Sequence, residues 1–151
     1  MPLQLPKVPF EQTFPLASDP TGETNVTIRQ ATQYGHELRE TLFSEASRIV
    51  RNAGQIGGGQ EIELKQRLSG SEIARKEVFL TLVGSNVQDE NGQPLFRFGL
   101  DGSSRQVLLD DEATFALKFG RLPHAWANEI HSFVGEVNPD WAIPGPNAKA
   151  P

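Results

Sequence analysis

The sequence predicts an α+β fold: a single small domain with about four helices and a small antiparallel sheet, flanked by extended proline-rich termini. Three observations predict it. Apolar residues alternate in short segments, as in strands, and recur every three or four residues in longer ones, as in helices. Five of the eleven prolines lie in residues 1–20 and four lie from Pro139 onward, and proline disfavours helix. We therefore expect an N-terminal arm at 1–21, an α+β domain at 22–141 and a disordered tail at 142–151.

The first half of the domain predicts two strands around a long helix. Val26 and Ile28 alternate with polar residues and predict a strand over 25–30. Over 34–52 an apolar stripe predicts an amphipathic helix with its charged residues, Arg39 among them, facing outward. The stripe comprises Leu38, Leu42, Ala46, Ile49 and Val50. Alternation over 61–68 predicts a second strand, which could pair with the first.

A second helix and two short strands should follow. Ser69 and Glu72 have the spacing of a capping box, which predicts a helix running to about Gly84. Its second half, VFLTLV, also has strand propensity, so a strand there is the alternative. Residues 88–92 predict a turn, and 94–98 and 106–109 predict strands on either side of a loop.

Two helices should end the domain. Asp110 or Asp111 is suited to cap the first helix, because an aspartate oxygen accepts hydrogen bonds from free N–H groups at a helix start. Pro123 should begin the second, since proline is tolerated in a first helical turn. The second helix has the clearest apolar stripe in the chain, and Asn138 with the following proline should end it.

Composition argues against several classes of function. The chain has 14 basic and 19 acidic residues and a net charge of −5, which disfavours nucleic acid as the main partner. It has no cysteine, so disulfides, thiolate metal sites and a cysteine nucleophile are excluded. No apolar run approaches the roughly 18 residues that a membrane helix requires. We expect neither nucleic acid nor a membrane as a partner.

The sequence also offers no catalytic motif. It lacks the G-x-S-x-G turn of many serine hydrolases, and His36, His124 and His131 have no spacing typical of a metal site. The acidic run at 110–112 suits a helix start, and the glycines at 57–59 follow a predicted helix, unlike a phosphate-binding loop. We expect no enzyme activity, no cofactor and no metal, and therefore a protein that acts by binding another protein.

Large apolar side chains are the candidate binding residues. Trp is enriched at interface hot spots, so the aromatics of the C-terminal helices are either binding anchors or core. Trp141, which lies beyond Pro139, should be the more exposed tryptophan. Phe10 and Phe14 in the N-terminal arm should dock on the domain's own surface or on a neighbouring subunit, which would allow self-association. The C-terminal candidates are Phe115, Phe119, Leu122, Trp126, Ile130, Phe133 and Trp141.

Three segments of the chain resemble the small tail assembly chaperones of long-tailed, siphovirus-like bacteriophages. They are TNVTIRQATQYGHELRETLFSEASRIVR, EVFLTLVGSNVQDENGQPLFRFG and FALKFGRLPHAWANEIHSFVGEVNPDW, which together span most of residues 22–141. The last carries the likeness best: a Phe-rich helix, Leu-Pro, a second helix and Val-Asn-Pro-x-Trp.

The resemblance implies a non-enzymatic protein of the infected bacterium's cytoplasm. Such proteins bind the aggregation-prone tape measure protein until tail tube subunits polymerise around it, are absent from the finished particle, and often exist in a longer, frameshifted form. Because the tape measure is typically helical, we expect its helix to lie in a groove of the C-terminal helix pair.

Two other interpretations stay open at this point. The protein could be a structural part of the virion, such as a neck, head-completion or tail subunit, that assembles through its N-terminal arm. It could also be a small enzyme or ligand-binding protein whose site is assembled from scattered residues, which a deep polar pocket would favour.

Overall fold

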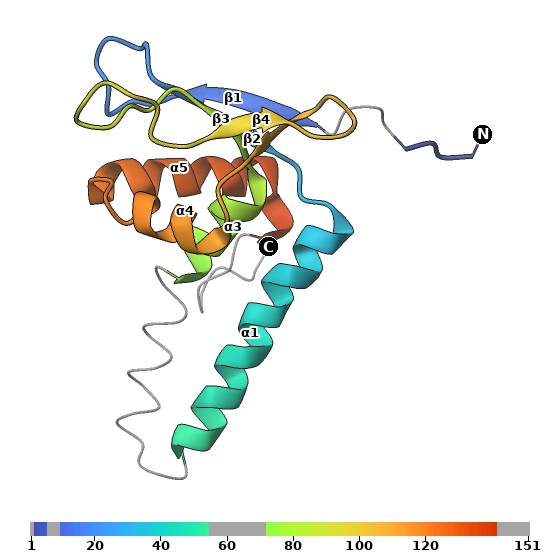
Figure 1. Ribbon diagram of the computed structural model, residues 1–151. Coiled ribbons are helices and arrows are strands. Elements are labelled where there is room, and N and C mark those ends of the chain that lie inside the picture. The colour runs from blue at the N-terminus through green and yellow to red at the C-terminus, as the bar shows by residue number, and fades with distance from the viewer. Residues whose placement is uncertain (1, 6–9, 55–71, 142–151) are drawn as a thin grey trace, which may run out of the picture. The chain divides into compact units, whose positions relative to one another are not determined.

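The computed structural model describes residues 2–5, 10–54 and 72–141. Within these ranges lie four α-helices, a three-stranded antiparallel sheet and a two-stranded antiparallel sheet (Figure 1), so the predicted α+β fold is confirmed. The residues gather into two compact units. Unit 1 combines the residues up to Gln30 with those from Thr81 onward, and unit 2 runs from Ala31 to Leu80.

The three-stranded sheet of unit 1 has the order β1-β2-β3. The strands are β1 (Glu11–Pro15), β2 (Asn25–Arg29) and β3 (Leu82–Ser85). On β2, Val26 and Ile28 are fully buried while Asn25, Thr27 and Arg29 are half-buried, as the alternating sequence predicts. The predicted strand over 25–30 is therefore confirmed.

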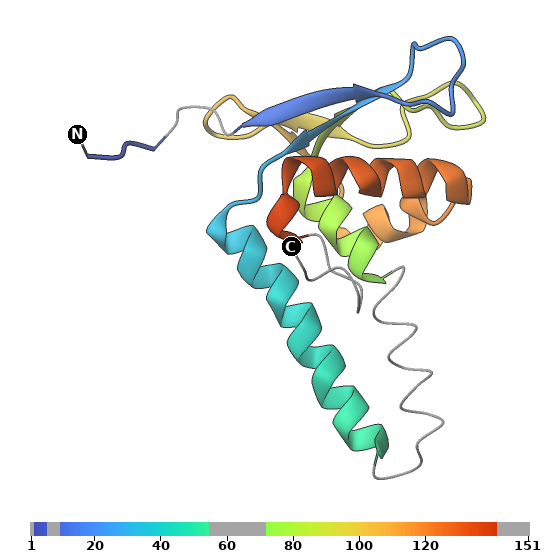
Figure 2. The same cartoon turned by 180° about the vertical axis from the view of Figure 1, so that it is seen from behind.

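Two helices of unit 1, α4 (Glu112–Phe119) and α5 (His124–Val137), form the layer beneath this sheet in Figures 1 and 2. Asp111 caps α4 by accepting a hydrogen bond from the Thr114 N–H at 2.7 Å, as predicted. Pro123 immediately precedes α5, also as predicted. Because α5 packs against β2 and β1, its apolar stripe covers the inner face of the sheet.

Strand β1 lies inside the range expected to be an N-terminal arm. Residues Glu11–Pro15 are extended but pair with β2, with Phe14 opposite Val26. The Phe14 ring is 7% exposed and stacks on Phe133 of α5, with 4.3 Å between ring centroids. The sheet therefore begins at Glu11, earlier than the expected boundary at residue 22, because Phe14 finds an aromatic partner within the same chain.

The core of unit 1 is aromatic and aliphatic, in keeping with its sequence. Phe115 lies between Phe96 and Phe119, with 5.4 Å between ring centroids in each pair. Such stacked pairs add to the stabilisation from burial alone. The buried apolar residues of unit 1 are Phe14, Leu16, Val26, Ile28, Leu82, Val83, Val87, Leu95, Phe96, Phe115, Phe119, Ile130, Val134, Val137 and Trp141.

The helix predicted to run to Gly84 is shorter than expected. Helix α3 (Ile73–Thr81) ends at Thr81, and β3 begins at Leu82 because the end of the segment pairs with β2. Gly84 fits this pairing, since a Cβ there would lie 3.3 Å from the Thr27 Cβ. The predicted strand over 61–68 and the predicted cap at Ser69 lie outside the described residues.

The two-stranded sheet consists of β4 (Phe98–Leu100) and β5 (Gln106–Leu108). The prediction of a strand over 94–98 was misplaced, because Pro94 makes only an isolated bridge to Gln88 and regular pairing starts at Phe98. The loop between the strands is held by Asp101, whose carboxylate accepts hydrogen bonds from the N–H groups of Ser103 and Arg105. Strand β5 lies beside β3.

Unit 2 contains α1 (Gln33–Gly54) and α3, joined by a buried ion pair. The Arg39 Nε and the Glu77 Oε2 lie 2.6 Å apart, and the two residues are 6% and 3% exposed. The prediction that Arg39 faces outward was therefore wrong, since the carboxylate of Glu77 compensates the cost of burying it. Leu38 and Leu42, predicted to face the core, are half-buried.

Candidate binding cleft

Most of the candidate binding residues are core residues. Phe115 and Ile130 are fully buried, and Phe119 is 8% exposed, so the core interpretation is correct for these three. Trp141 is 3% exposed within a short 3-10 helix, η2 (Pro139–Trp141), and the expectation that it is the more exposed tryptophan was wrong. Its ring is buried because η2 packs against α5.

The remaining candidates keep some exposure. Leu122, Trp126 and Phe133 are half-buried, and Phe10 is 57% exposed. Phe133 uses one ring face in its stack on Phe14. Among them, Trp126 also lines a cleft built from described residues.

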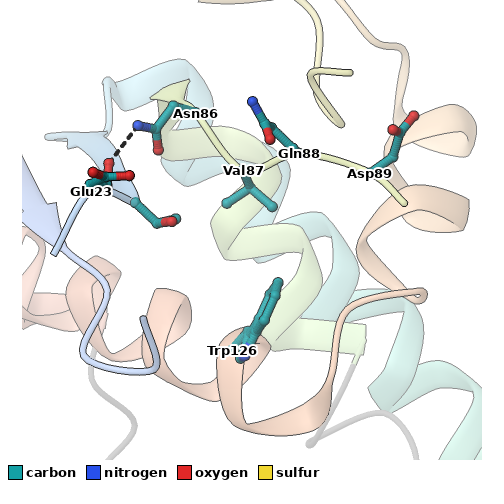
Figure 3. A pocket seen from close by; sticks show the side chains of 7 residues that line it. Glu23, Asn86, Val87, Gln88, Asp89 and Trp126 are labelled. Carbon is teal, nitrogen blue, oxygen red and sulfur yellow. Dashed lines mark hydrogen bonds between the residues drawn. The ribbon is translucent and has the colours of Figure 1, made fainter. Parts of the chain in front are cut away.

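The cleft lies in unit 1 between Trp126, the end of the β1–β2 connection and the segment that follows β3 (Figure 3). Its volume is about 340 Å³. In Figure 3 the Val87 side chain points toward the Trp126 ring, while the side chains of Gln88 and Asp89 point away from it. Val87 and Trp126 therefore form an apolar floor. The lining residues are Glu23, Thr24, Asn86, Val87, Gln88, Asp89 and Trp126.

The cleft exists because the pairing of β2 with the chain after β3 stops at Asn86. The Asn86 N–H still donates to the Asn25 C=O, at 3.3 Å. The Asn86 side chain then replaces the backbone: its Oδ1 accepts from the Asn25 N–H at 2.8 Å, and its Nδ2 donates to the Glu23 C=O at 2.7 Å. Because the amide uses the groups that a continued ladder would need, the two segments separate beyond it.

Gln88 is left with an open backbone edge on this side. Its neighbours pair in the other direction, the Val87 C=O with the Leu95 N–H at 2.9 Å and the Asp89 N–H with the Gln93 C=O at 2.7 Å. Because backbone groups alternate in direction along an extended segment, the N–H and C=O of Gln88 face the gap toward Glu23. Neither group bonds to any residue that the structure describes.

The rim of the cleft is acidic. The exposed Glu23 carboxylate accepts no hydrogen bond within the described ranges, whereas the Asp89 carboxylate accepts two, from the Asn91 and Gln93 N–H groups. Behind Thr24 lies Asp19, whose pKa is held well below its usual range by hydrogen bonds from the Thr24 hydroxyl and then from Thr21.

The α5 helix is fixed beside the cleft by Glu129. Burial raises the pKa of Glu129, but hydrogen bonds from the Ala17 N–H and from the N–H and hydroxyl of Ser18 outweigh it, so the pKa lies below its usual value. An ionised Glu129 therefore ties the chain after β1 to α5, one helical turn beyond Trp126.

The histidines and carboxylates do not assemble into a metal site within the described residues. No three His, Asp or Glu side chains there converge closely enough to hold an ion. His124 is exposed at the start of α5, and His36 lies 3.7 Å from Glu40 on the surface of α1. The cleft itself offers an apolar floor, an open backbone edge and a carboxylate.

Sequence reasoning identified Trp126 but missed the rest of the cleft. The sequence predicted a turn over 88–92 and gave no role to Glu23, Asn86 or Val87. The local signal was Asn86, an asparagine between a strand and a turn. Its two backbone partners, Asn25 and Glu23, lie 61 and 63 positions earlier in the chain. No single segment carries that information.

None of the helices in the described ranges combines the length and the apolar character needed to cross a bilayer. No protein-family model, curated protein or solved structure matches this chain.

Proposed function

We propose that this protein is a bacteriophage tail assembly chaperone that binds the tape measure protein and keeps it soluble while tail tube subunits assemble. The observation that carries the proposal is the order and the residue pattern of three segments that resemble such chaperones, above all residues 115–141. The proposal places the protein in the cytoplasm of the infected bacterium, with the tape measure protein and the tail tube protein as partners.

The Trp126 cleft supports the proposal as a place for a client to bind. Trp126 belongs to the segment with the strongest resemblance, and the cleft combines apolar surface with exposed backbone, which peptide-binding sites use. A groove formed by the whole C-terminal aromatic stripe is not available, because Phe115, Phe119 and Ile130 are core residues. The proposed contact therefore involves the start of α5 rather than both C-terminal helices.

The proposed function is tested by co-expressing the protein with the tape measure protein of the same phage. We expect the tape measure protein to become soluble and to co-purify with the full chain, and to pellet when expressed alone. A Trp126→Ala variant that stays folded should recover less soluble client. Failure of the wild-type chain to raise client solubility or to co-purify with it would contradict the proposal.

A second candidate function is that of a structural virion protein that assembles through residues preceding β1. The observation that favours it is the exposure of Leu3, Leu5 and Phe10, at 103%, 92% and 57%. Buried Phe14, in contrast, is already used inside unit 1. Mass spectrometry of purified particles separates the two functions: several copies per virion would favour the structural role, and absence would favour the chaperone.

A further inference from the structure

We propose that the Trp126 cleft binds an extended segment of the partner protein and that a lysine or arginine side chain of this segment lies over the Trp126 indole, beside Glu23. The inference rests on the proposed function only for the identity of the partner. The chemistry of the bound segment follows from the cleft itself, through three features: backbone, aromatic floor and charge.

The backbone of Gln88 favours an extended peptide. Its N–H and C=O face the gap between the chain after β3 and the end of the β1–β2 connection. The Asn86 side chain occupies the backbone groups of Asn25 and Glu23, so the antiparallel pairing within this chain does not continue to Gln88. A segment added alongside Gln88 would accept a hydrogen bond from the N–H and donate one to the C=O. This is the pairing by which peptides extend an open sheet edge.

The aromatic floor favours a long side chain with a positive end. In Figure 3 the Val87 side chain points toward the Trp126 ring, which is seen edge-on, and Trp126 is half-buried. A lysine or arginine stem would lie along this apolar floor, and its charged head would be attracted by the indole face. The cleft is about 340 Å³ and open to solvent, which suits one inserted side chain of a longer segment.

Charge decides between a basic segment and a purely apolar one. The Glu23 carboxylate has no partner among the described residues, Asp89 lies at the opposite rim, and ionised Asp19 lies behind Thr24. The nearby cation Arg121 is already paired with Glu90. The local field is therefore negative, so it attracts a basic segment and repels an acidic one.

The test uses the full-length chain and the indole N–H resonances of its two tryptophans. Blocked peptides of equal length, differing only in a central lysine, norleucine or glutamate, are titrated into the protein. We expect the lysine peptide to shift the Trp126 indole resonance and to leave that of buried Trp141 unchanged. Its Kd should be about threefold to tenfold lower than that of the norleucine peptide, and the glutamate peptide should bind most weakly.

Matched variants locate the binding. Glu23→Gln and Glu136→Gln remove the same charge, inside and outside the cleft, and both side chains are exposed. We expect only Glu23→Gln to weaken the lysine peptide, Trp126→Leu to abolish the lysine preference, and Gln88→Pro to weaken all three peptides by removing the free N–H. Equal binding of the lysine and norleucine peptides, or no shift at Trp126, would overturn the inference.

The outcome is distinguishable from failure of the proposed function. Peptide titration needs no client, so a lysine preference at Trp126 supports the cleft chemistry even if the tape measure protein stays insoluble on co-expression. Conversely, a client that is kept soluble equally well by the wild type and by Trp126→Leu would preserve the chaperone function and overturn this cleft as its binding site.

Discussion

The two tryptophans at opposite ends of α5 have opposite environments. Trp126 lies in the first turn, half-buried beneath an open cleft, whereas Trp141 lies just beyond the last turn and is 3% exposed. Both follow a proline closely in the sequence. The difference comes from what packs opposite each ring: a gap in the sheet above Trp126, and the end of α5 against Trp141.

Polar groups determine which end is closed. At the C-terminal end, Asn138 is 2% exposed and its side-chain amide donates to the Arg29 C=O at 3.2 Å and to the Val134 C=O at 3.3 Å. The Trp141 N–H in turn donates to the Asn138 C=O at 2.9 Å. At the other end, the Asn86 amide holds two segments apart. Asn138 therefore helps to close the core around Trp141, whereas Asn86 interrupts the backbone pairing beside Trp126 and leaves the cleft open.

Trp141→Ala should show the largest effect on stability. Truncating a buried tryptophan leaves a large cavity, so we expect a loss of about 3–5 kcal/mol in the free energy of unfolding. Urea denaturation followed by circular dichroism measures this loss. Trp126→Ala is the matched control and should cost less than half as much; equal losses for the two variants would break the comparison.

Asn138→Ala should have the next largest effect. Removing the amide leaves the C=O of Arg29 without this donor in a buried region, which should cost about 1–3 kcal/mol. Urea denaturation again measures the loss, and the fluorescence of Trp141 should become more accessible to acrylamide quenching. A variant with unchanged stability and unchanged quenching would show that Asn138 does not close this end.

Glu129→Gln should have a smaller effect that depends on pH. The folded-state pKa of Glu129 is lowered, so its stabilisation is fully present above the ordinary value of 4.5 and is lost as pH falls through the folded pKa. At pH 7 we expect a loss of about 0.5–1 kcal/mol, because the partly exposed carboxylate is screened by solvent.

The pH series is the check for Glu129. The difference in unfolding free energy between the wild type and Glu129→Gln should shrink below about pH 4.5 and disappear once the wild-type carboxyl is protonated. A difference that stays constant down to the lowest accessible pH would mean that the charge of Glu129 does not tie Ala17 and Ser18 to α5.

Glu23→Gln should have the smallest effect on stability. Its carboxylate is exposed and has no partner within the described ranges, so we expect a change within about 0.5 kcal/mol in denaturation experiments. A larger loss would assign Glu23 a structural role at the cleft and would weaken its use as a probe of ligand charge.

Local patterns in the sequence predicted most of the secondary structure of unit 1. Alternation identified β2, and the charge and proline at helix starts identified α4 and α5. The predictions that failed concerned residues whose partners lie far away in the sequence. Arg39 has the sequence context of a surface residue but is buried, paired with Glu77 from a distant part of the chain. Phe14 belongs to the sheet because Phe133 stacks on it.

The candidate site was less predictable for the same reason. Whether a tryptophan on an amphipathic helix is a core residue or a binding anchor depends on what packs opposite it. For Trp126 the opposite side is formed by two other parts of the chain, residues 23–24 and 86–89. The exposed and buried tryptophans were consequently interchanged in the prediction. The acidic character of the cleft was equally hidden, because Glu23 and Asp89 lie far apart in the sequence.

Strand β1 has a consequence for how this protein behaves when concentrated. The Phe10 C=O accepts from the Gln30 N–H and the Leu16 N–H donates to the Thr24 C=O, at the two ends of β2. By alternation the outward positions of β1 are Glu11, Thr13 and Pro15. A charge and a proline at an edge discourage a second chain from adding there and starting an aggregate. The exposed edge of β1 is therefore protected against edge-to-edge pairing with a second chain, whereas the interrupted backbone edge at Gln88 stays open to another chain.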